Sequence, residues 1–293
     1  MHHPTQITPK YTENEVYKFV DNDDFMDAYV ELLKNSIECL WYIVYLKYYE
    51  KNDTPKEILK DDAVVGGNLI RLIKLNTSFL ENVCNNKTEI CLIVNRCLAE
   101  TAINLKYLLI ESEERVKRNY IKYSLITEKE LWEVIKSKIS ERPEDVWNIE
   151  KRMQKSIQNS FDDSDFDLED INRSSKWKSI KSRADAVAGE MFYSVYYGIG
   201  SHSVHGNWQD ILTNNLDRFG ENFKLHINWQ KPRPQMMDLA IFFNLDILNL
   251  FIQKELEVDE DTELLKKNYT TLLDYGRLLT EAHEKMLKKK NGL

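Results

Sequence analysis

Two histidines lie close together in the segment Tyr193–Gly206, which reads YSVYYGIGSHSVHG. Histidine is the side chain whose ordinary pKa lies closest to neutrality, and it therefore serves most often as a general acid or base. His202 and His205 follow a tyrosine-rich stretch that includes Tyr197, and Ser201 lies one turn before His205 if the segment is helical. These four side chains are our candidate catalytic residues.

The spacing of His202 and His205 could hold a metal ion, but two ligands of a common type are weak evidence for a metal site. Zinc sites in proteins use three or four protein ligands, and no HExxH motif or carboxylate stands near His202 and His205. Ser201 also lacks the sequence of a nucleophile elbow. We therefore expect proton transfer without a metal or a cofactor. The structural alternative is that His205 caps a helix end or bonds a backbone carbonyl, and that the tyrosines pack in a core or an interface.

A second group of polar side chains interrupts the apolar run at residues 88–110. Arg96, Glu100 and Asn104 recur every four residues and so share one side of a helix. We expect Arg96 and Glu100 to form an ion pair within the core, with Asn104 bonded to another helix. In the functional interpretation, Arg96 is a clamp for an anion or phosphate and Glu100 holds it in place. In the structural interpretation, the pair serves packing alone.

A third group is the basic run RSSKWKSIKSR at residues 173–183. Basic side chains around an aromatic one are typical of surfaces that bind nucleic acids or phosphates, whereas a charged run can also be a solvated face paired with the acids at 161–170. The candidate contacts for RNA or a nucleotide are Arg173, Lys176, Trp177, Lys178, Lys181 and Arg183.

The elements that must position these residues are helices. Nine glycines and six prolines are few for 293 residues, and apolar residues recur with a helical period along most of the chain. This predicts an all-α, compact multi-helix bundle, at least three-fifths helical, with at most one short strand or hairpin near 223–229. We expect an N-terminal arm at 1–20 and a single helical domain at 21–293 that closes with helices at 236–288. The pattern also predicts helix starts at Thr127, from a capping box, and at about Asp185.

Net charge and cysteine usage restrict the binding partners and the cellular compartment. A net charge of −8 repels polyanions, so contact with RNA requires a local basic patch. The four cysteines form no CxxC pair, which favours buried, reduced thiols in a cytoplasmic protein. The run 88–110 is long enough to span a membrane, but its central charged residues oppose insertion. We expect a cytoplasmic protein with no membrane contact, and a homodimer is left open.

Three motifs occur in the order of a known family. They are NRCLAETAINLKYLL, SSKWKSI, and Tyr197-x-x-x-Ser201-x-x-x-His205-Gly206. Over about residues 24–215 the chain resembles the bacterial domain of unknown function 5677 family. The resemblance implies a compact helical domain, loosely similar to the HEPN group of nucleotide-binding and RNA-cleaving domains. HEPN ribonucleases carry an arginine shortly before the histidine on one helix. Here the nearest upstream arginine is Arg183, so Arg96 would supply the cation from a neighbouring helix.

Two functions follow as expectations. The first is a metal-independent ribonuclease or phosphate-ligand domain of HEPN type, serving bacterial defence. In it His205 is the general acid or base, Arg96 stabilises phosphate and Glu100 orients Arg96. The second is a non-catalytic helical interaction or sensor module in which the same residues form a buried polar network. Whether the protein is an enzyme is left open at this point.

Overall fold

The fold is helical almost throughout. The computed structural model describes residues 5–50, 52–142, 145–172, 176–189, 193 and 198–292, with the backbone alone at 198–201 and 291. Of the residues described, 73% are helical, and their only sheet is a two-stranded antiparallel hairpin. The predicted all-α helical bundle is therefore confirmed.

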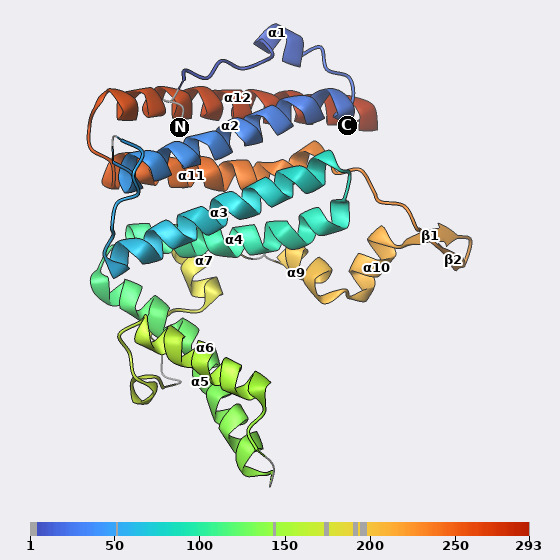
Figure 1. Cartoon of the computed structure of the whole chain (residues 1–293). Helices are drawn as coiled ribbons and strands as arrows, with labels where there is room; N and C mark the ends of the chain where they lie inside the picture. Colours follow the sequence, from blue (N-terminus) through green and yellow to red (C-terminus); the bar gives the residue numbers. More distant parts are fainter. Residues whose placement is uncertain are drawn as a thin grey trace. The chain divides into compact units, whose positions relative to one another are not determined.

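Contacts between residues divide the chain into two compact units, residues 1–110 with 180–293, and residues 111–179. We describe each unit by itself, and the single domain expected at 21–293 stays a prediction. The first unit contains α1 (Glu13–Val16), α2 (Asn22–Tyr48), α3 (Lys60–Cys84), α4 (Thr88–Ile110), α7 (Ile180–Ala188), α9 (Gly198–His205), α10 (Trp208–Asn214), β1 (Leu216–Phe219), β2 (Asn222–Leu225), the 3-10 turn η3 (Pro234–Met237), α11 (Asp238–Lys254) and α12 (Glu260–Asn291) (Figure 1).

The long helices of the first unit lie side by side because each has one apolar face to bury. In α2, Phe25, Tyr29, Leu32, Leu40 and Ile43 have the spacing of one helical side and are fully or almost fully buried. Helix α2 packs against α3, α11 and α12, and α4 packs against α3 and α11 (Figure 1). This arrangement makes α2, α4 and α11 central to the unit.

Three polar side chains are sealed inside this core and satisfy one another. Asn244 of α11 donates to Ser36 Oγ of α2 at 2.9 Å and to Asn76 Oδ1 of α3 at 3.1 Å. Asn76 in turn donates to Asn244 Oδ1 at 2.9 Å, and Ser36 donates to the carbonyl of Leu33. Buried polar groups must be paired, so this network fixes the register of α2, α3 and α11.

Two apolar segments of the first unit are long enough to span a membrane. The run at 88–110 forms α4, which is buried in the first unit as the sequence predicts. Among the described helices, Pro234–Lys254 is the one candidate by length and composition, and 61% of its most apolar window is buried. Helix α11 occupies this segment and packs against α2, α4 and α12, as a core helix does.

The cysteines are only partly as expected. Cys39 and Cys91 are buried free thiols, and burial raises the pKa of each to about 12. Cys84 is exposed at the end of α3 and Cys97 is half-buried, so the expectation that all four are buried is wrong.

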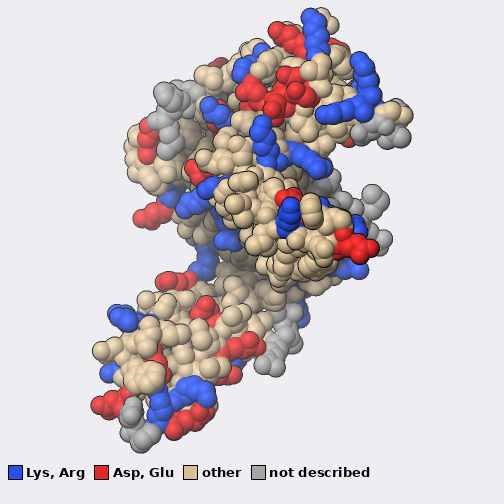
Figure 2. Space-filling model, turned by 90° about the vertical axis from the view of Figure 1, so that its right-hand side faces the viewer, with Lys and Arg blue, Asp and Glu red and all other residues tan. Residues whose placement is uncertain are grey.

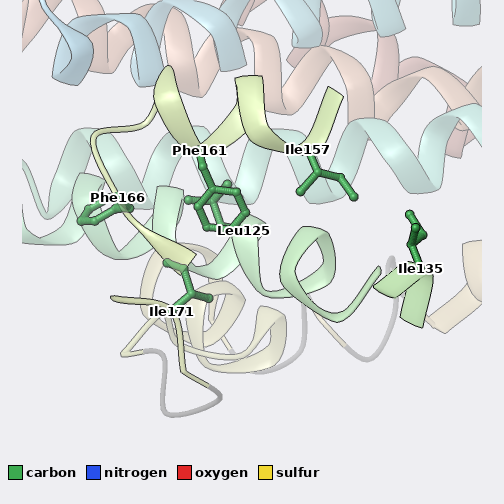
Figure 3. Packing of buried hydrophobic residues seen from close by; sticks show 6 residues of the cluster. All are labelled: Leu125, Ile135, Ile157, Phe161, Phe166 and Ile171. Atoms are coloured by element: carbon green, nitrogen blue, oxygen red, sulfur yellow. The ribbon is translucent and has the colours of Figure 1, made fainter. Parts of the chain in front are cut away.

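The second unit contains α5 (Glu114–Ser140), α6 (Asn148–Asp162) and the 3-10 turn η1 (Leu168–Asp170). Its core is a cluster in which α5 and α6 bury apolar side chains against the segment that follows α6 (Figure 3). The helix start predicted at Thr127 is wrong, because α5 continues through that residue. No glycine or proline precedes Thr127 to end the first part of the helix. The buried residues of this cluster are Leu125, Ile135, Ile157, Phe161, Phe166 and Ile171.

Two boundaries near the candidate site differ from expectation. The helix predicted from about Asp185 starts earlier, at Ile180, and α7 ends at Ala188 before Gly189, whose φ is +83°. Glycine adopts this left-handed backbone at little cost. The predicted strand or hairpin is present, but its strands are Leu216–Phe219 and Asn222–Leu225, joined through Gly220 at φ +62°.

Candidate functional site

The Arg96–Glu100 pair is present on α4. Arg96 Nη1 donates to Glu100 Oε2 at 2.8 Å, across one turn of the helix. The two side chains are 13% and 44% exposed, so the arginine is largely buried and the carboxylate is not. The expectation of a pair within the core is therefore wrong for Glu100. Such a carboxylate can hold the guanidinium in one orientation while part of the pair faces solvent.

Asn104 does not behave as predicted. Its Oδ1 is buried and has no hydrogen-bond partner among the residues that the structure describes. The expected bond from Asn104 to another helix is absent for this atom. The helix instead reaches its neighbours through other polar residues: Arg71 Nε donates to Thr101 Oγ1, and Lys106 pairs with Asp246 of α11.

Helix α9 contains both histidines and packs against α4. His202 and His205 are exposed, and the backbone of Ser201 lies one turn before His205. The Nδ1 atom of His202 lies 2.5 Å from Asn207 Nδ2, which requires that this ring nitrogen accepts the hydrogen bond. Asn207 also caps α10, because its Oδ1 accepts from the backbone N–H of Asp210 at 3.2 Å. The bond from Asn207 thus orients the His202 imidazole, and both imidazoles are exposed to solvent.

Exposed aromatic side chains adjoin this pair of histidines. Trp208 begins α10 three residues after His205, is 58% exposed, and meets Phe223 of β2 edge to face at 5.8 Å between ring centroids. The sequence predicts at most one short strand or hairpin near 223–229 and does not single out Trp208 or Phe223. Aromatic residues in a segment too short to build its own core were the available signal. Other large apolar side chains exposed here are Ile211, Phe219, Leu225, Ile227 and Trp229.

Arg183 differs from the solvent-facing contact that the sequence suggested. It is 4% exposed on α7, a helix that packs against α4. Arg183 therefore belongs to the interior of the first unit. Burying a guanidinium there costs free energy unless hydrogen-bond acceptors surround it. Lys181 of the same helix is exposed and can contact a phosphate. Helices α7 and α9 both pack against α4, so Arg96 and Arg183 lie on a pair of adjoining helices.

The remaining basic residues lie in the second unit. Lys176 and Lys178 are exposed, but Trp177 between them is 6% exposed and meets Tyr120 of α5 edge to face at 5.2 Å. Trp177 therefore cannot stack on a base and instead anchors the two lysines beside α5. A groove of about 610 Å³ on the same unit is lined by Glu113, Glu114, Arg115, Arg118, Asn119 and Lys122.

The structure does not describe every residue that the sequence predicts for the site. Tyr197 and Arg173 lie outside the described residues, and Ser201 is described by its backbone alone. Within the described ranges, no three His, Cys, Asp or Glu side chains are grouped so that they could hold a metal ion. A site that works without a metal or a cofactor stays a prediction.

The surface charge is mixed. On the face drawn in Figure 2, lysine and arginine side chains are interspersed with aspartate and glutamate, and no single large basic area covers it. With a net charge of −8, long-range attraction of a polyanion is weak. Any phosphate contact must therefore come from a few local cations.

These features define an all-α protein with a guanidinium–carboxylate pair and two exposed histidines on packed helices. The chain belongs to the family of unknown function DUF5677, which matches residues 62–223, more than half of its length. The resemblance inferred from the three motifs is thereby confirmed, while the likeness to HEPN domains stays a prediction. Comparison with curated proteins and with solved structures gave no match.

Proposed function

We propose that the protein binds single-stranded RNA at the surface of α9 and α10 and cleaves it without a metal, in the manner of HEPN ribonucleases. The observation that supports this most directly is the packing of α9, which carries the exposed His205, against α4, which carries the Arg96–Glu100 pair. A setting in bacterial defence rests on the HEPN likeness alone.

The proposed chemistry uses the RNA's own 2′-hydroxyl. One imidazole accepts the proton of that hydroxyl as its oxygen attacks the adjacent phosphorus. The bond from phosphorus to the 5′ oxygen breaks, and a protonated imidazole donates a proton to the leaving oxygen. The products are a 2′,3′-cyclic phosphate and a 5′-hydroxyl. His205 accepts the proton of the 2′-hydroxyl. His202 donates to the leaving oxygen in its protonated form, in which its Nδ1 carries a proton and no longer accepts the hydrogen bond from Asn207.

Negative charge develops on the phosphate oxygens during this step, and a fixed cation stabilises it. Arg96 is our candidate for this cation, because Glu100 restrains its guanidinium at 2.8 Å.

Binding would combine stacking and charge. Exposed aromatic rings hold single-stranded bases by stacking. Trp208, three residues after His205, and Phe223, which contacts Trp208, supply such rings. Exposed lysines neutralise phosphates, and Lys181 of α7 supplies such a charge within the same unit.

The test is cleavage of unstructured RNA in the presence of EDTA, which removes divalent metals. Proton transfer by a positioned side chain contributes about 10²–10⁴-fold to rate, so His205→Ala should lose at least about a hundredfold. His226→Ala is the matched control, because this histidine follows the hairpin and contacts Asp217. It should cleave like the wild type. A wild-type protein inactive in EDTA, or a fully active His205→Ala variant, would overturn the proposal.

A second candidate function is a non-catalytic interaction module. The exposed apolar side chains of α10 and the hairpin favour it, because contiguous apolar surface commonly marks an interaction site. The double variant Trp208→Ala/Phe223→Ala separates the two functions. If the protein is a ribonuclease, this double variant should bind RNA less tightly than the wild type. If it is an interaction module, the wild type should bind no RNA, and the double variant should change the association with a protein partner.

A further inference from the structure

A cavity of about 640 Å³ lies in the first unit, away from the histidines, between α2, α11 and α12. This volume lies within the range of pockets that hold small organic ligands. Neither the chemistry proposed for His205 nor the family match at residues 62–223 involves it. All of its lining residues lie in described parts of the chain, on α2, α11 and α12.

Most of the wall is apolar. Leu32, Ile241 and Leu245 line it from α2 and α11, and Leu273 lines it from α12. Phe242 is half exposed at the cavity. An apolar wall of this kind favours a hydrocarbon chain or ring over a fully polar ligand, because each buried methylene group contributes roughly 0.8 kcal/mol.

The charged side chains of the cavity are predominantly acidic. Four carboxylates line it, against the single cation Arg277. Asp246 pairs with Lys106, Glu281 pairs with Lys285 at 2.8 Å, and Arg277 lies 3.6 Å from Asp274. Among the residues that the structure describes, Asp238 and Glu284 form no ion pair with a lysine or arginine.

Asp238 and Glu284 thus supply negative charge that is not neutralised locally. Asp238 is the first residue of α11 and is partly buried, beside Tyr29 and Glu284. Burial, with a further contribution from the Glu284 charge, raises the pKa of Asp238 to about 6, although a hydrogen bond from Tyr29 opposes the rise. The charged form of Asp238 is therefore destabilised by its surroundings, and a cation that enters the cavity stabilises it.

We propose that this cavity binds a small amphipathic organic cation, with its ammonium group between Asp238 and Glu284 and its apolar part against Ile241, Phe242 and Leu245. The hydroxyls of Tyr29 and Thr280, which lie 3.3 Å apart, are positioned to bond the same ammonium. The excess of carboxylates disfavours an anion of equal size. A neutral molecule would leave the charges of Asp238 and Glu284 without a partner.

Three probes with the same hydrocarbon chain test the proposal: octylamine, 1-octanol and octanoate. Binding of each to the full chain is measured by titration calorimetry at pH 7.5. A hydrogen bond to a charged group corresponds to a difference of about ten- to a hundredfold in affinity. We therefore expect octylamine to bind at least about tenfold more tightly than 1-octanol, and octanoate to bind more weakly than either.

Variants assign the selectivity to named side chains. Asp238→Asn should reduce the preference for octylamine over 1-octanol to near unity. Glu284→Gln, an exposed change that leaves the fold intact, should reduce the preference partially. Phe242→Ala should weaken both probes about equally. Glu257→Gln removes the same charge from the loop after α11, outside the cavity, and should leave all affinities unchanged.

Three outcomes would overturn the proposal. The first is equal binding of octylamine and octanoate, and the second is a preference that survives both Asp238→Asn and Glu284→Gln. The third is a dimer in sedimentation that Phe242→Ala dissociates and that excludes octylamine, because a second copy of the chain would then be the occupant. Loss of cleavage activity in a His205 variant has no bearing on these measurements, so the two proposals fail independently.

Discussion

Asn76 of α3 and Asn244 of α11 donate amide hydrogen bonds to each other, at 2.9 and 3.1 Å. Both side chains are fully buried, and Asn244 is bonded also to Ser36 of α2. A paired amide bridge of this kind is satisfied only when the three helices keep one register. It therefore contributes specificity to the bundle as well as stability.

Removing one member of this bridge should destabilise the protein. Asn244→Leu leaves the amide of Asn76 buried with fewer partners, at a cost of about 1–3 kcal/mol in the free energy of unfolding. The double variant Asn76→Leu/Asn244→Leu should cost less than the two single variants added together, because no amide is then stranded. Urea unfolding of the four proteins measures this. Gln253→Leu, on the exposed side of α11, is the control and should change little; strictly additive effects would contradict the prediction.

Glu100→Gln should have a smaller effect on stability than a buried pair would give. The sequence suggests a cost of about 3–5 kcal/mol, as for a buried ion pair that loses one partner. Glu100 is 44% exposed, so solvent screens the pair and we expect about 1 kcal/mol or less. The difference should shrink further in 1 M NaCl when unfolding is repeated there. A large, salt-independent loss would show that Glu100 has a structural role beyond Arg96.

The raised pKa of Asp238 predicts a particular pH dependence. Its pKa rises from the ordinary value of 3.8 to about 6 in the folded protein, so between these values the folded state binds more protons than the unfolded state. The contribution of Asp238 to stability is therefore full below pH 3.8 and is lost as the pH rises through 6. Asp238→Asn should stabilise the protein by about 1–3 kcal/mol at pH 7.5 and by much less at pH 4.

Other titratable or charged groups that line the same cavity also affect this measurement. They are Tyr29 on α2 and Glu284, Glu281 and Arg277 on α12, together with Asp246 on α11. The comparison is therefore between Asp238→Asn and wild type in urea at each pH, which cancels titrations that the two proteins share. A stabilisation of equal size at pH 4 and pH 7.5 would assign the effect to packing and not to charge.

The basic segment gives a prediction that separates its lysines from its tryptophan. Lys176→Gln/Lys178→Gln removes two exposed cations, so the slope of log affinity for RNA against log salt should decrease by up to about 2. Trp177→Ala should instead lower the midpoint of thermal unfolding, because the ring is buried against Tyr120. Fluorescence anisotropy with a labelled RNA measures the first effect. If the lysine variant and the wild type have equal slopes of log affinity against log salt, these lysines do not belong to the binding surface.

The sequence predicts the helical class well because it depends on local patterns. Apolar periodicity and few turn-forming residues specify α2, α3, α4, α11 and α12, and the four-residue spacing of Arg96 and Glu100 predicts their contact. Exposure is harder to predict from such a pattern. Spacing shows that Glu100 shares a side with Arg96, but only the packing of neighbouring helices decides how much water reaches each.

Features that depend on distant segments could not be predicted from the sequence. Trp177 in a basic run is typical of a nucleic-acid surface, yet its ring is buried by Tyr120, more than fifty residues earlier. Asp238 belongs to a helix start that looks ordinary, and its environment arises from Tyr29 and Glu284 at opposite ends of the chain. Both cases require knowledge of tertiary packing, which no local pattern contains.

The boundaries of the family match have a consequence for evolution. Residues 62–223 begin within α3 and end within β2, so this inherited segment contains Asn76 but not its partner Asn244. On its own it would leave the sides of α3 and α4 that α2 and α11 cover exposed to water. Relatives that lack counterparts of α2 and α11 must therefore shield those sides in another way, through different flanking helices or a separate polypeptide. The helices outside this segment, α2, α11 and α12, also enclose the acidic cavity.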